Sequence, residues 1–272
     1  MADDAQAARS PPPLLERVAV MRFQPFPVAT FNQKADEWQA KIATEYGDRD
    51  VLQEWKLNIP EKNGIPDFAS LQTDLILHRR FWKAAGEKRA IAMQCRNGWV
   101  SFNVVNHEGN RHRYVDLKEE VSRCLPDWAQ HFGVQHLSEY SLVYINRLCK
   151  RSTPQFFECS NGKETLHLNR VLTAFGQAPF PGTIVPPYTF TLNFQLGNDP
   201  GKVLKYSVTS VEKKSGPAEV MVDVRLEMTI KAGEHEDTPA HAVKYLDSCH
   251  ETLLEAYKHF FTQDALQSFE EI

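Results

Sequence analysis

Long apolar runs are missing from this sequence. No stretch reaches the length of about 20 consecutive apolar residues that a membrane-spanning helix needs. The first ten residues, MADDAQAARS, are acidic and polar, and they lack the basic start and apolar middle of an export signal. We therefore predict a protein without a membrane span that resides in the cytoplasm.

Cysteine is scarce, and the spacing of the cysteines matches no known motif. The five cysteines lie far apart, and no two have the spacing of a CxxC redox motif or a zinc finger. The sequence also has no GxxxxGK[ST], GxGxxG, HExxH or GxSxG motif. We therefore expect reduced thiols, no metal and no cofactor. An enzyme is disfavoured, although the question stays open at this point.

Charge of one sign is not concentrated anywhere in the chain. The net charge is -4, from 31 basic and 35 acidic residues, and no block of five or six like charges occurs. Nucleic-acid binding usually leaves a basic footprint in the composition, so this class of partner is disfavoured.

What the sequence does contain is a strong period of two in its second half. In the stretch 218–231, valine, leucine, methionine and isoleucine occupy every second position, with charged and polar residues between them. The stretch 187–197 alternates in the same way. Such alternation is typical of antiparallel strands with one buried and one solvated face. Thr238-Pro239 then predicts the start of a helix whose apolar stripe covers the sheet.

The first half combines strands with two helical periods. Asn97-Gly98 is the dipeptide that best fits a two-residue hairpin turn. Gly133 is expected to end the second helix, and Pro126 to kink or divide it. We predict strands at 14–26, 75–85, 89–95, 99–105, 141–150 and 202–214, helices at 32–46 and 116–132, an irregular segment at 50–70 and a short last helix at 262–272.

Together these patterns predict an α+β fold with largely antiparallel sheets, a hairpin and a C-terminal meander, covered by helices. Residues 1–13 end in Ser-Pro-Pro-Pro and are expected to be a flexible lead-in. The order of elements predicts two similar α+β halves, 14–135 and 136–272, packed as one globular unit.

Four short stretches, taken in order, carry a resemblance. They are PPPLLERVAVMRF (11–23), AMQCRNGWVSFNVV (92–105), YINRL (144–148) and YLDSCHETLLEAYKHFFTQDAL (245–266). The chain resembles a family of sporadically distributed prokaryotic proteins of about this length whose function is not established. The resemblance implies a shared fold and no known reaction. Where the family pattern has Asn-Trp-Arg after the hairpin, this chain has Asn103-Val104-Val105-Asn106.

Four residues are candidates for a ligand-binding or partner-binding site. Asp247 and His250 are three residues apart on the last helix, close enough for a carboxylate to orient an imidazole. The structural alternative is a buried histidine hydrogen-bonded to the sheet. Asn146 lies on the apolar face of its strand, where a buried amide requires partners, and Arg147 points to the opposite face. No catalytic residue and no metal ligand is predicted.

Two classes of function therefore remain. The first is a non-catalytic binding or protein-interaction protein that uses the open sheet face, an edge strand or the irregular stretch 152–187. The second is a small-molecule-binding protein or enzyme with a pocket between the sheet and the last helix, lined by Asn146 and His250. We prefer the first, because no cluster in the sequence nominates a reaction. Phe190, Phe194 and Trp99 are expected in the core.

Overall fold

The structure is a computed structural model. It describes residues 14–58, 61–62, 65–66, 72–85, 88–107, 112–160, 163–173, 189–197, 199–211, 220–232 and 238–269. The expected lead-in at 1–13 lies outside the described residues.

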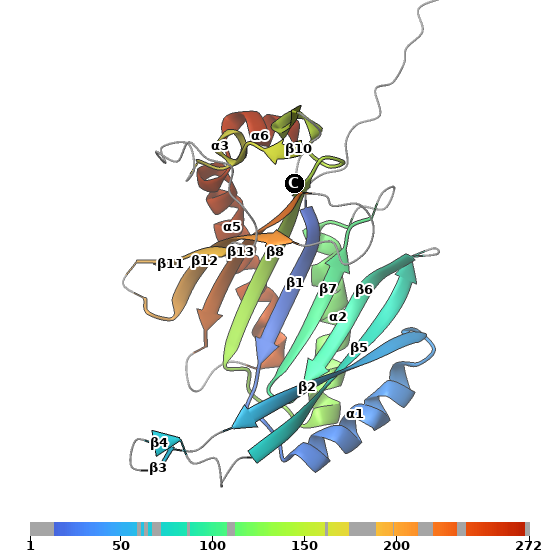
Figure 1. Ribbon diagram of the computed structural model, residues 1–272. Helices are drawn as coiled ribbons and strands as arrows, with labels where there is room; N and C mark the ends of the chain where they lie inside the picture. The colour runs from blue at the N-terminus through green and yellow to red at the C-terminus, as the bar shows by residue number, and fades with distance from the viewer. Residues whose placement is uncertain are drawn as a thin grey trace, which may run out of the picture.

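A nine-stranded antiparallel sheet forms the centre of the molecule (Figure 1). Its strand order is β11-β12-β13-β8-β1-β7-β6-β5-β2, and each neighbouring pair is antiparallel. The strands are β1 (Leu14–Arg22), β2 (Asp48–Asn58), β5 (Gln72–Ala85), β6 (Lys88–Arg96), β7 (Trp99–Val105), β8 (Glu139–Cys149), β11 (Thr189–Gln195), β12 (Lys202–Val211) and β13 (Met221–Lys231). The chain is therefore α+β with a large antiparallel sheet, as the sequence predicts.

The strand order repeats between the two parts of the chain. In the first part a meander returns so that its last strand, β7, pairs with β1. In the second part the meander β11-β12-β13 returns so that β13 pairs with β8. Antiparallel pairing of β1 with β8 joins the two sets into one continuous sheet.

Three long helices pack on a single face of this sheet. They are α1 (Val28–Ile42), α2 (Tyr114–Phe132) and α5 (Ala242–Phe260). Helix α5 packs on β13 and β8, α2 packs on β7 and β1, and α1 packs on α2 and β5. In Figure 1 these helices lie behind the sheet, and none of the helices that the structure describes crosses its front. We call the front the helix-free face. None of the described helices is long and apolar enough to cross a membrane.

Smaller elements complete the fold. They are β3 (Glu61–Lys62), β4 (Ile65–Pro66), η2 (Pro154–Phe156), β9 (Phe157–Ser160), β10 (Lys163–Leu166), α3 (Leu168–Val171), η3 (Pro239–His241) and α6 (Gln263–Ser268). Helices α3 and α6 lie together at one end of the sheet (Figure 1).

The core lies between the sheet and the helix layer. Its largest fully buried side chains are aromatic, and they come from both layers: Trp38, Trp128, Tyr140, Tyr144, Tyr206, Tyr257, Phe31, Phe81, Phe102 and Phe132. Large rings of this kind bury much apolar area each and supply most of the hydrophobic stabilisation of such a layer. Within the predicted helix 32–46, the side chains that recur at helical spacing are buried: Ala35, Trp38, Ile42 and Tyr46.

Several predicted boundaries were wrong. Helix α1 begins at Val28 behind Pro27, not at Asn32, because Phe31 is needed in the core, where its ring packs against Phe132. The segment predicted as irregular contains β2, an edge strand that pairs with β5 along its whole length. An edge strand needs no apolar face, so the polar sequence of β2 does not show the alternation from which a strand is predicted.

Two further expectations were also corrected. Pro126 lies inside α2 without dividing it. Phe190 and Phe194 are each 37% exposed, because β11 is the outermost strand and covers only the rim of the helix layer. Trp99 is half-buried on the helix-free face, where its ring meets His78.

The predicted hairpin is confirmed. Strands β6 and β7 pair up to Arg96 and Trp99, and Gly98 has a φ of 101° in the turn between them. A Cβ atom at Gly98 would lie 3.4 Å from Pro25 Cγ.

We expect Gly98→Ala to lower the free energy of unfolding by about 1–2 kcal/mol, because a side chain disfavours this left-handed conformation. Urea unfolding measures the change. Gly47→Ala is the control, since its added methyl group meets nothing within 4 Å and its φ is not in the positive range. Equal effects of the two substitutions would contradict the prediction.

Candidate functional site

Strand β1 places charged side chains on both faces of the sheet. Successive residues of a strand point to opposite faces, so Glu16 and Arg17 lie back to back. Glu16 pairs with Val105 and Ile145 on the helix-free face, while Arg17 faces the helix layer beside Tyr144. Each of the two residues belongs to a separate polar cluster.

Asn146 is a buried tie between the sheet and α5. Its side chain is fully buried, its Oδ1 accepts a hydrogen bond from the Tyr257 hydroxyl, and its Nδ2 donates to the Val224 carbonyl at 3.4 Å. Burial raises the pKa of Tyr257 well above its usual range, so this hydroxyl stays a donor. These contacts occupy the amide, as expected for a residue that links neighbouring strands and the last helix.

Asp247 and His250 lie close together but have different partners. Asp247 accepts hydrogen bonds from the Tyr114 hydroxyl at 3.0 Å and from Lys118 Nζ at 2.8 Å. His250 Nδ1 is 2.5 Å from the Tyr144 hydroxyl. The carboxylate therefore links α5 to α2, and it does not hydrogen-bond the imidazole.

The His250 ring lies between two tyrosines. The Tyr114 ring stacks on it with centroids 3.9 Å apart, and Tyr144 holds it from the sheet. Burial lowers the pKa of His250, and the positive charge of Arg17 lowers it further. The imidazole is therefore neutral at pH 7, in a position that joins sheet, α2 and α5.

We expect His250→Ala to lower the free energy of unfolding by about 1–3 kcal/mol at pH 7, because it leaves the buried Tyr144 hydroxyl unpaired. A histidine whose folded pKa is depressed contributes stability that is present above 6.5 and is lost as the pH falls through the folded pKa. The stability difference between wild type and variant should thus shrink toward acid pH. Urea unfolding at several pH values tests this, with the exposed His259→Ala as control; a difference independent of pH would refute it.

Arg147 points to the helix-free face, as predicted. Its Nε and Nη2 donate to the two carboxylate oxygens of Asp223, each at 2.8 Å. On β13, the strand that also carries Asp223, Arg225 pairs with Glu227 at 3.0 Å. The expected wet face of the meander thus carries fixed pairs of opposite charge.

A continuous row of polar side chains crosses four adjacent strands on the same face. Arg80 Nε donates to Gln94 Oε1 at 3.0 Å, and Gln94 Nε2 donates to Asn103 Oδ1 at 3.0 Å. Asn103 Nδ2 then donates to Glu16 Oε1 at 2.5 Å. Ser101 Oγ adds a bond to Asn103 Oδ1 at 3.0 Å. We call Arg80, Gln94, Asn103 and Glu16 the polar row.

Side chains in and beside the polar row are buried on the helix-free face. Asn103 and Ser101 are 5% and 2% exposed, and Val143, on the same face of β8, is 1% exposed. Burial raises the pKa of Glu16, while the hydrogen bond from Asn103 and the charges of Arg80, Arg225 and Arg147 lower it less strongly. Glu16 is thus a half-buried carboxyl group that is held by Asn103 and lies in the field of three arginines.

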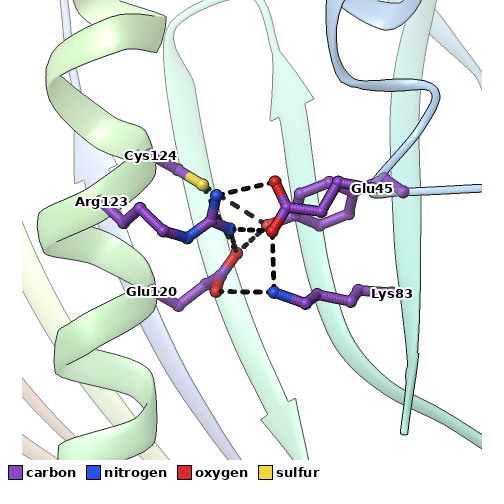
Figure 2. Close-up of polar contacts among 6 residues, drawn as sticks. Glu45, Lys83, Glu120, Arg123 and Cys124 are labelled. Atoms are coloured by element: carbon purple, nitrogen blue, oxygen red, sulfur yellow. Dashed lines mark hydrogen bonds and ion pairs between the residues drawn. The ribbon is translucent and has the colours of Figure 1, made fainter.

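A second charged cluster lies between the helices (Figure 2). Arg123 of α2 binds Glu45, just after α1, at 2.7 Å and Glu120 at 2.5 Å, and Lys83 of β5 binds Glu45 at 2.8 Å. The buried Glu120 also accepts a hydrogen bond from the Tyr46 hydroxyl. Each acid has basic or hydroxyl partners, so this cluster clamps α1, α2 and β5 together.

The thiols and acids of the described residues do not assemble a reactive centre. Burial raises the pKa of Cys95, Cys124 and Cys249 to about 12, which keeps these cysteines as unreactive thiols. Within the described ranges, no group of three or more histidine, cysteine or acidic side chains could hold a metal ion.

Comparisons with known proteins add no family. No protein-family model matches this chain, and a search of curated proteins finds no match.

The sequence did not nominate the polar row. Gln94, Ser101 and Asn103 alternate with apolar residues in β6 and β7, a pattern that predicts one polar face but not the hydrogen bonds across it. Glu16 could have been noticed as the one acid in an otherwise apolar and basic strand.

We expect Glu16→Gln to stabilise the protein at pH 7, because it removes the charge whose burial is unfavourable. An acid with a raised folded pKa contributes stability that is present below its ordinary pKa of 4.5 and is lost as the pH rises through the folded value. The advantage of the variant should therefore vanish toward pH 4. Thermal unfolding between pH 4 and pH 8 measures it, with the exposed Glu119→Gln as control. A variant that is less stable than wild type at neutral pH would show the carboxylate to be structural.

Proposed function

We propose that this is a non-catalytic binding protein of the cytoplasm that holds a protein partner on the helix-free face of its sheet. The observation that carries the proposal is the polar row, a set of hydrogen-bonded side chains spanning β5, β6, β7 and β1 on the face without helices. Hydrogen bonds that fix these side chains in advance reduce the entropy lost on binding.

The distribution of charge on this face favours a protein over a nucleic acid. Arginines alternate with acids, as in the pairs Arg147–Asp223 and Arg225–Glu227, so the face has no uniform sign. Phosphate backbones require an excess of positive charge. A protein surface with complementary charges fits this alternation of positive and negative side chains better. A partner with a different charge pattern would bring like charges together, which disfavours its binding.

Two findings support a non-catalytic role. The buried thiols are held protonated, and the candidate pair Asp247 and His250 is divided between Lys118 and Tyr144. A general base needs an oriented, titratable group that reaches substrate, and His250 is stacked beneath Tyr114 instead. Membership of the family that the sequence resembles remains part of this proposal.

Affinity capture from the native host followed by binding measurements tests the proposal. Arg225 is exposed on the helix-free face, and we expect Arg225→Glu to weaken the purified partner's affinity by about tenfold or more, through the like charges that it brings together. Lys258→Glu makes the same change of charge on an exposed position of α5 and should leave the affinity unchanged. The proposed binding surface would be wrong if only Lys258→Glu changed the partner's affinity, or if neither variant changed it.

A further inference from the structure

Arg17 is a buried arginine without an acidic partner. Its side chain lies under the helix layer, and the residue is 4% exposed. Nη1 donates to the His112 carbonyl, and the guanidinium carbon is 5.5 Å from the centroid of the Tyr144 ring. Nε is buried without a hydrogen-bond partner, and no described carboxylate forms an ion pair with Arg17.

A buried guanidinium in this condition is unfavourable. Removing a cation from water is compensated only when an anion or a full set of acceptors replaces the water. Here the His112 carbonyl, the Tyr144 hydroxyl and the face of the Tyr144 ring replace it, and none of these is an anion. Arg22, on the same strand but exposed, does have a carboxylate partner in Glu139 at 2.7 Å.

Two acids on the helices that cover this face, Asp247 of α5 and Asp116 of α2, have other partners. Asp247 accepts two hydrogen bonds from Lys118 and one from Tyr114. Asp116, in the first turn of α2, accepts the backbone N–H of Arg113 at 2.5 Å and lies 3.8 Å from His112 Nδ1. Neither compensates the guanidinium.

The start of α2 supplies further donors beside Arg17. The helix begins at Tyr114, two residues after the carbonyl that Arg17 contacts, and the Asp116 N–H of its first turn donates to the Arg113 carbonyl at 3.1 Å. The other N–H groups of a first helical turn have no acceptor one turn earlier within the helix. This end of a helix carries a partial positive charge. His112 Nε2 is also buried without a hydrogen-bond partner in the described part of the chain.

We propose that Arg17, His112 and the first turn of α2 form a binding site for the oxyanion of a small molecule, a phosphate or carboxylate group. The planar fork of a guanidinium matches two oxygens of such a group, and an imidazole N–H can donate to one of them. The charged and titratable groups around the site are Arg17, His112, Arg113, Lys118, Asp116, Asp247 and His250. Both aspartates are held by other donors, so the uncompensated charge is positive.

This site lies on the opposite side of the sheet from the proposed partner surface. The observations that support it, at Arg17, His112 and the start of α2, do not involve the polar row. Either proposal can therefore fail without the other.

Thermal unfolding of the full chain with added anion tests the site. Sodium phosphate and sodium acetate are compared with sodium chloride at equal ionic strength, for wild type, Arg17→Met and Arg22→Met. We expect phosphate or acetate to raise the melting temperature of wild type and Arg22→Met beyond the chloride control. Arg17→Met should not respond, and in chloride it should be at least as stable as wild type. A response to phosphate alone identifies a phosphate ligand, and a response to acetate alone a carboxylate.

The wild-type protein is decisive by itself if Arg17→Met does not fold. A melting temperature no higher in phosphate or acetate than in chloride would overturn the site. An equal response of wild type and Arg17→Lys would do the same, because lysine retains the charge but lacks the two-pronged donor.

Discussion

The pairing of β1 with strands on both its sides is the constraint on which the rest of this structure depends. Strand β1 bonds to β7 through one edge and to β8 through the other, so it closes the first meander and joins it to the second. Its period of two also divides the molecule chemically. Glu16 ends the polar row on one face, and Arg17 is enclosed beneath the helices on the other.

The two faces of the sheet consequently have different physical tasks. The helix-covered face is filled with aromatic and aliphatic side chains, and its polar groups Asn146 and His250 have defined partners that fix the helices to the strands. The helix-free face carries the polar row and the Arg147–Asp223 pair, and these hydrogen bonds run between strands rather than between layers. Stability therefore depends mainly on the first face, and the proposed partner would bind to the second.

Local patterns predicted most of the fold and little of the candidate sites. The alternation in 218–231 specifies its strand directly, because burial of one face imposes a period of two on the side chains. The Asn97-Gly98 turn specifies the hairpin that it connects. Strand β2 escaped notice because an edge strand exposes both faces. The polar row and the isolation of Arg17 depend on which strands become neighbours, and no short stretch encodes that. Asp247 and His250 are near in sequence, but α2 supplies the hydrogen-bond partners of Asp247 and β8 supplies that of His250.

The central place of β1 also bears on how the chain is made. A ribosome releases β1 and its meander well before β8 exists, so one edge of β1 has open backbone groups during synthesis. Unpaired edges of this kind attract other chains, and pairings distant in sequence form slowly. The chain is thus most prone to aggregation while its N-terminal part has been synthesised and β8 has not. A chain truncated before β8 would keep that edge of β1 exposed permanently.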